Sequence, residues 1–121
     1  MEKIKLTVAE SLKLNEEIDG LINEKLPVHV KFSLHNLKKK VVGYVESFQS
    51  TQKELFDKYG YQDGGMYKIN KDSEGYKTFV EETDKLMKQE VEIDYNPFKL
   101  STFENIETIV PLDVFFKLVI S

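Results

Sequence analysis

The feature that most constrains this chain is the segment 30–59, in which apolar side chains recur every three or four positions and proline is absent. The recurring side chains are Val30, Leu34, Leu37, Val41, Tyr44, Phe48, Leu55 and Tyr59. This spacing predicts a single α-helix, about 45 Å long at 1.5 Å per residue. Because the chain has only 121 residues, such a helix is longer than its core needs, and we expect it to form a spine for the other elements.

The segment before the spine is predicted to form another helix. Thr7 and Glu10 have the spacing of a capping box, in which each side chain accepts a hydrogen bond from the backbone amide of the other residue. Pro27 ends this helix because proline disfavours helical geometry at the residue before it. The link of residues 25–27 is short, so the two helices should pack as an antiparallel hairpin. The apolar side of the first helix consists of Leu12, Leu14, Ile18, Leu21 and Ile22.

Turn residues and a second cap follow the spine. Gly60 is expected to end the spine in the left-handed backbone conformation that glycine tolerates. Residues 61–72 contain Asp-Gly and Gly-Gly turn signals, which indicate a small hairpin or an exposed loop. Asp72 or Ser73 then caps a third, amphipathic helix. The apolar stripe of this helix consists of Tyr76, Phe79, Val80, Thr83, Leu86 and Met87.

Strand patterns flank the helices. Residues 3–6 and 91–95 alternate charged and apolar side chains, which is the period of a strand with one buried face. A capping signal at residues 101–104 predicts a brief helix, and Pro111 fits the start of a last helix over Leu112–Ile120. No repeat or linker divides the sequence.

We therefore predict one domain, residues 1–121, of the α+β class. It is helix-dominated, with a long helical hairpin and a third helix packed beside a small antiparallel sheet.

Composition excludes several classes of function. The net charge is −4 and all 17 cationic side chains are lysines, which argues against nucleic acid or anionic membrane as partners and against bidentate arginine recognition of phosphate. The chain has no cysteine, so it has no disulfide, thiolate metal site or thiol nucleophile. No apolar run approaches the ~20 residues of a membrane span, and no signal peptide follows Met1. We expect a cytoplasmic protein.

The titratable residues form no catalytic or metal-binding pattern. His29 and His35 are six residues apart, so on a helix they point about 120° away from each other and cannot share a metal ion. The paired acids could serve glycoside or metal chemistry, but they fall on faces that we assign to solvent. These acidic clusters are Glu16, Glu17 and Asp19; Glu81, Glu82 and Asp84; and Glu90, Glu92 and Asp94.

The remaining polar motifs have structural explanations. Lys38–Lys40 fan over about 200° of a helix, so they are expected to flank the buried seam, with a phosphate or acidic partner as the alternative. Gly64-Gly65 lacks the helix start and lysine of a phosphate-binding loop and is assigned to a turn. Residues 57–63 lack the ligand spacing of a calcium loop. We therefore predict a non-enzymatic protein with no catalytic, cofactor-binding or metal-binding residue.

A protein partner is the function class that the sequence favours. Packing in the core or at its edge is the commoner explanation for the tyrosines around residues 61–72. The alternative is an interface, because tyrosine offers apolar area with a polar tip. The last predicted helix has more apolar surface than one core-facing side can bury, so self-association or a protein partner is expected. The alternative is that this helix is wholly core. The predicted partner-binding residues are Tyr61, Met66, Tyr67, Ile69, Phe115, Phe116 and Val119.

Four segments resemble a group of small proteins that tailed phages and prophages encode. The segments are Lys5–Leu12, Lys25–Val28, Lys53–Gly60 and Glu90–Ser101. Members of this group are described as of unknown function or as phage structural proteins. The likeness spans most of the chain, but its motifs are caps, helix ends and strand patterns, so it implies architecture and no active residues. The C-terminal residues 115–121 are more apolar than the acidic ending typical of the group.

The resemblance implies a phage accessory or structural protein that acts by binding a phage or host protein, in the host cytoplasm or associated with the virion. The alternative is an inhibitor of a host enzyme or defence complex, for which a compact acidic chain could mimic nucleic acid or occupy a basic groove.

Overall fold

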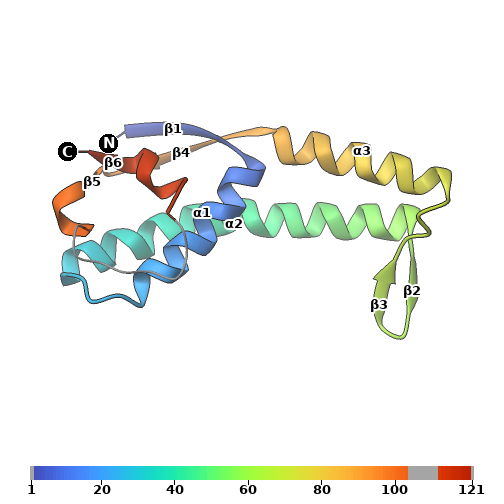
Figure 1. Cartoon of the computed structure of the whole chain (residues 1–121), viewed down its shortest axis with the longest axis horizontal. Helices are drawn as coiled ribbons and strands as arrows, with labels where there is room; N and C mark the ends of the chain where they lie inside the picture. Colours follow the sequence, from blue (N-terminus) through green and yellow to red (C-terminus); the bar gives the residue numbers. More distant parts are fainter. Residues whose placement is uncertain (1, 104–111, 121) are drawn as a thin grey trace.

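One long helix organises the molecule. Helix α2, Val28–Tyr59, has 32 residues and spans about 48 Å. Helix α1, Val8–Ile22, packs along its N-terminal half, and helix α3, Glu74–Lys88, lies along its C-terminal half (Figure 1). The predicted spine, helical hairpin and third helix are therefore confirmed. The computed structural model describes residues 2–103 and 112–120, apart from the side chains of Gln62, Asp63 and Tyr67.

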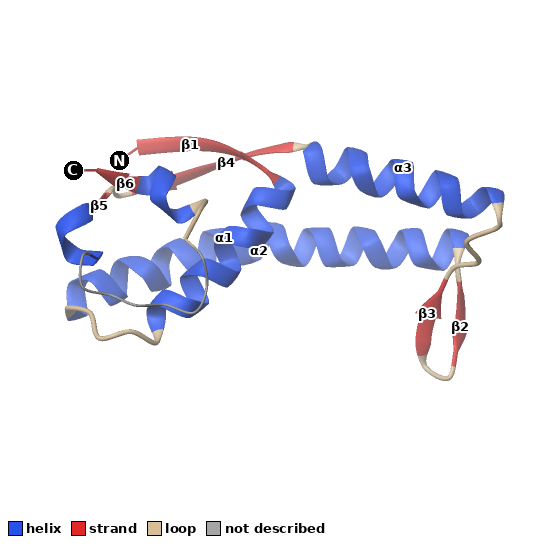
Figure 2. Ribbon diagram, in the orientation of Figure 1, coloured by secondary structure: helices blue, strands red, loops and turns tan. Residues whose placement is uncertain are grey.

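The strands form three short pairs among the described residues (Figure 2). β1, Glu2–Thr7, pairs antiparallel with β4, Glu90–Tyr95, which confirms the predicted sheet. After α2, β2 (Tyr61–Asp63) and β3 (Met66–Lys68) form a hairpin. β5, Phe98–Lys99, pairs in parallel with β6, Val119–Ile120.

Side-chain caps set the starts of α1 and α3. The amide of Glu10 donates to the Thr7 hydroxyl at 3.1 Å, and the amide of Thr7 donates to the Glu10 carboxylate at 3.0 Å. The predicted capping box is therefore present. Ser73 caps α3 by accepting from the amide of Tyr76 at 3.2 Å. Each cap satisfies an amide that has no partner within its own helix.

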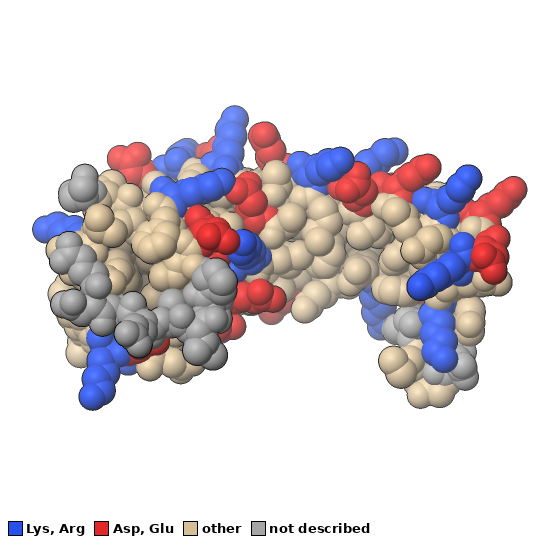
Figure 3. All heavy atoms as spheres, in the orientation of Figure 1, with Lys and Arg blue, Asp and Glu red and all other residues tan. Residues whose placement is uncertain are grey.

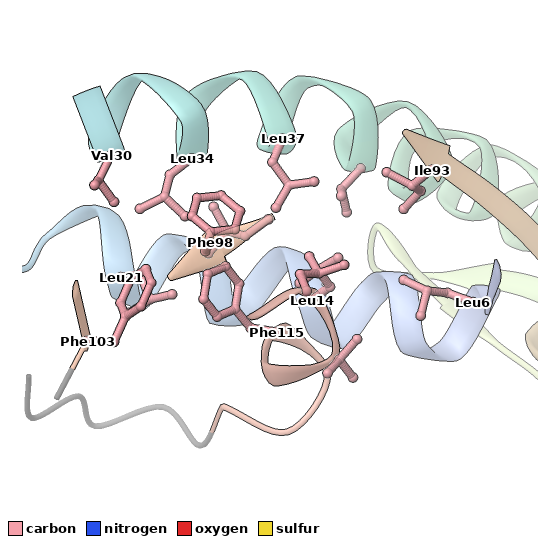
Figure 4. Close-up of a cluster of buried hydrophobic side chains, with 14 residues drawn as sticks. Leu6, Leu14, Leu21, Val30, Leu34, Leu37, Ile93, Phe98, Phe103 and Phe115 are labelled. Carbon is pink, nitrogen blue, oxygen red and sulfur yellow. The ribbon is translucent and has the colours of Figure 1, made fainter. Parts of the chain in front are cut away.

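The hydrophobic core lies at one end of the molecule, between α1, the N-terminal half of α2, the β1–β4 sheet and the C-terminal segment (Figure 4). On the spine, Val41 and Phe48 are buried, and Val45 is partly buried at the core edge. The buried members of the cluster are Leu6, Leu14, Ile18, Leu21, Val30, Leu34, Leu37, Val41, Ile93, Phe98, Phe103, Val114, Phe115 and Leu118.

The predicted last helix is wrong. Residues 115–118 form a single 3-10 turn, and the next two residues leave helical geometry to pair with β5. The turn buries Phe115 and Leu118, which are three residues apart and therefore lie on the same side of a 3-10 helix, while Phe116 is exposed. The predicted brief helix is a 3-10 turn at Leu100–Phe103. Glu104 and Pro111, which entered those predictions, lie outside the described residues.

Candidate functional site

The first half of the predicted partner surface is the hairpin that follows α2. Its strands are antiparallel, with Tyr61 opposite Lys68. Gly64 and Gly65 join them with φ angles of 59° and 82°, and two successive positive φ angles are those of a type I′ turn. The Gly-Gly signal is therefore a tight hairpin turn.

Gly60 fixes the base of this hairpin. Its φ of −115° and ψ of −165° are extended, so the expected left-handed helix end is wrong. A Cβ atom at this position would lie 2.6 Å from the carbonyl oxygen of Lys68 and 2.9 Å from Cγ1 of Ile69. Glycine is needed here because the returning strand crosses directly over the end of α2. This contact determines where the hairpin leaves the helix.

The hairpin presents large side chains to solvent. Tyr61 is 53% exposed and Met66 is 66% exposed, whereas Ile69 is half-buried beside Gly60. The backbone of Tyr67 lies in β3, but its side chain is outside the described part of the structure. Figure 3 shows the hairpin projecting from the body of the molecule, so a partner can reach it without displacing another element.

The second half of the predicted surface belongs mostly to the core. The Phe115 ring is fully buried, with its centroid 5.1 Å from that of Phe98 and 5.3 Å from that of Phe103. Val119 is half-buried in β6. Phe116 is 50% exposed and is therefore the member of this group that faces solvent. Phe115 must be removed from the candidate partner surface.

A buried carboxylate holds the C-terminal segment in place. Glu17 on α1 is completely buried and accepts the backbone amides of Val114 at 3.2 Å and Phe115 at 2.9 Å. Its assignment to a solvated face is therefore wrong. The sequence contains a signal for this position, because Glu17 follows Leu14 by three residues and precedes Leu21 by four, which places it on the buried stripe of α1.

Two ion pairs flank this buried carboxylate. Lys13 donates to Asp113 at 2.5 Å, and this hydrogen bond raises the pKa of the Lys13 ammonium. Lys117 pairs with Glu10. That hydrogen bond, together with the backbone amide of Thr7, lowers the pKa of the Glu10 carboxyl. The C-terminal segment is thus bound to α1 by charged contacts on both sides of its buried aromatic ring.

The structure does not bring the two predicted halves together. The hairpin lies at the C-terminal end of α2, whereas β6, which contains Val119 and follows Phe116 closely in sequence, lies near the chain termini at the other end (Figure 1). The length of α2 separates them. A single small partner would therefore contact one half or the other.

Two of the cavities along α2 are lined by side chains that donate hydrogen bonds to the backbone of β4. Cavities of about 350 and 500 Å³ between α2 and β4 share Lys40 and Asp94. The Lys40 ammonium donates to the carbonyl of Asp94 at 2.7 Å, and the Tyr44 hydroxyl donates to the carbonyl of Glu92 at 3.0 Å. These groups close the outer edge of β4, so they serve the fold.

The other polar groups considered in the sequence are also dispersed. His29 and His35 are both exposed, and Lys38 pairs with Asp19 of α1. Within residues 2–103 and 112–120, no three His, Asp or Glu side chains gather closely enough to hold a metal ion. None of the described helices combines the length and apolarity required to cross a lipid bilayer.

Comparison of the chain with protein families, curated proteins and solved structures found no match.

Proposed function

We propose that this chain is a non-enzymatic phage accessory or structural protein that acts by binding another protein through the β2–β3 hairpin. The observation that supports this proposal is the exposure of Tyr61 and Met66 on a projecting hairpin. The contact of Gly60 with the returning strand holds that hairpin at the end of α2. A surface held in one arrangement loses little conformational entropy on binding.

The chemistry of the hairpin suits a protein partner. Tyrosine and methionine offer large apolar contact areas, and the tyrosine hydroxyl adds a hydrogen bond at the edge of the interface. Aromatic residues and methionine are enriched at protein interfaces, where a few large anchors carry most of the binding energy.

The test is partner recovery by a hairpin variant. A tagged chain is used for pull-down from phage-infected cells, followed by mass spectrometry, in parallel with Tyr61→Ala/Met66→Ala. The double variant should recover the partner at least about tenfold less well, since each anchor is expected to contribute more than 1 kcal/mol. Val28→Ala is the matched control, because Val28 is 85% exposed at the opposite end of α2.

Equal recovery by the double variant and the wild type would contradict binding through the hairpin. The identity of a hairpin-dependent partner separates the two functions that the sequence suggested. Virion proteins would support the accessory or structural role, whereas one host enzyme or defence component would support the inhibitor.

A further inference from the structure

Helix α3 has an apolar stripe that α2 covers only in part. Phe79 packs against Phe56 of α2, with ring centroids 4.7 Å apart, and this contact forms the seam between the helices. None of the residues of α3, all of which the structure describes, is buried. In contrast, α1 has completely buried leucines.

The arrangement of the elements explains this exposure. The start of α1 contacts the C-terminal end of α3, where the amide of Val8 donates to the carbonyl of Gln89 at 2.8 Å. Towards the other end of α3, the described elements are α2, α3 and the hairpin beyond their ends (Figure 1), so the α2–α3 seam is flanked by solvent there. This half is therefore an incomplete helical bundle.

One flank of the seam is a groove. Cavities of about 310 and 220 Å³ share Thr51, Leu86 and Gln89, so they adjoin each other along the seam, and Val8 of α1 and Val91 of β4 also line the larger one. Phe48 and Leu55 of α2 add apolar lining. A groove between two helices is the shape that accepts the side-chain ridge of a further helix.

Two opposite charges line the same groove. Glu82 and Lys85 of α3 are both exposed, and neither has an ion pair among the described residues. On the same helix, Lys88 already pairs with Asp84 at 2.9 Å. A helix that docks in the groove therefore meets one carboxylate and one ammonium, each without a counter-charge.

We infer that the groove is occupied by a second copy of this chain, whose α3 lies antiparallel across it. A two-fold axis between antiparallel copies places Glu82 of each copy opposite Lys85 of the other, so both charges are paired by one symmetric contact. A partner surface of a single charge would pair only one of them. The dimer is a four-helix bundle made of two α2–α3 pairs.

The charge of α3 permits this association. The helix contains three lysines and four carboxylates, so it is nearly neutral although the whole chain carries −4. Two copies can therefore approach along α3 without strong repulsion. This surface is separate from the hairpin, and the inference does not depend on what the hairpin binds.

The test is sedimentation equilibrium of the full chain and of charge-reversed variants. The wild type should dimerise in the micromolar range expected of a small interface. Glu82→Lys and Lys85→Glu should each weaken the dimer at least about tenfold, because each places like charges opposite one another. Glu81→Lys is the matched control, since it makes the same charge change on α3 at an exposed residue that does not line the groove.

Charge exchange makes the test specific. In an equimolar mixture of the Glu82→Lys and Lys85→Glu chains, one copy carries only lysines at these two positions and the other only carboxylates. The mixture should therefore form a heterodimer, and the doubly substituted chain Glu82→Lys/Lys85→Glu should dimerise with itself. Circular dichroism checks that each variant is folded.

Three results would overturn the inference. The wild type could sediment as a monomer at every concentration. The dimer could survive both single reversals unchanged. Finally, both single reversals could weaken the dimer without restoration in the mixture or in the doubly substituted chain.

Discussion

Replacing Glu17 by glutamine should release the C-terminal segment from α1. The carboxylate accepts the amides of Val114 and Phe115 with one oxygen each, and it is completely buried. Glutamine keeps the size of the side chain and one carbonyl oxygen. The glutamine oxygen can accept from only one of the two backbone amides. The NH₂ group then faces the other amide, which is a buried donor left without an acceptor.

The size of the effect follows from this count of hydrogen bonds. An unsatisfied buried donor costs about 1–3 kcal/mol, and the remaining bond loses roughly 1 kcal/mol when its acceptor becomes neutral. Burying an amide instead of a carboxylate returns part of that cost. We therefore expect Glu17→Gln to lower the free energy of unfolding by about 2 kcal/mol.

Urea denaturation measures the loss of stability, and hydrogen exchange at the amides of Val114 and Phe115 locates it. Glu16→Gln is the control, because Glu16 is exposed on the same helix and its change should stay within about 0.5 kcal/mol. An unchanged denaturation midpoint for Glu17→Gln would refute the reasoning. So would a large destabilisation with unchanged exchange at the two amides, because the loss would then arise elsewhere.

Further predictions concern the spine, its cap and bound cofactors. Phe48→Ala should lower the free energy of unfolding, measured by urea denaturation, by about 3 kcal/mol. This is the low end for a buried phenylalanine, because the ring of Phe48 already borders a cavity. An unchanged free energy of unfolding would mean that the ring is not part of the core. Gly43→Ala should raise the melting temperature through a gain of about 0.5–1 kcal/mol, since a Cβ at this mid-helix position meets nothing within 4 Å; a loss would indicate a contact that the structure lacks. The pKa of Glu10 is lowered from 4.5 in the folded state. Its contribution to stability is therefore present above pH 4.5 and is lost as the pH falls through the folded-state pKa. Glu10→Gln should remove this contribution and make stability fall less steeply with decreasing pH in the acid range. No divalent ion or nucleotide should raise the melting temperature by several degrees, and a reproducible shift of that size would contradict a cofactor-independent fold.

Local chemistry made much of the fold predictable from the sequence. The Thr7 and Ser73 caps depend on residues within one turn, and the strand alternation around Ile93 depends on its immediate neighbours. Such signals do not require knowledge of the tertiary structure. The starts of α1 and α3 and the strands β1 and β4 were therefore accessible from the sequence.

The errors occur where distant residues decide the outcome. The apolar segment after Pro111 fits a helix on composition alone, but pairing with β5 draws its last residues into a strand. Gly60 is required by the carbonyl of Lys68, eight residues further along the chain, and not by its own φ angle. The burial of Glu17 depends on amides nearly 100 residues away. In the candidate site, the exposed hairpin was predictable from its turn residues, whereas its distance from Phe116 was not.

The pairing of β1 with β4 has a consequence for how the chain folds. Glu2 lies opposite Tyr95, so pairing of the two strands closes a loop that contains most of the chain. The contacts within the helical hairpin are closer in sequence, so we expect the hairpin to form before the sheet. During synthesis on the ribosome, β1 therefore emerges long before its partner strand. Lys3 and Lys5 alternate along this strand, and lysine on an unpaired strand discourages association with other chains. We therefore expect these two charges to limit association of the nascent chain until residues 90–95 have been made.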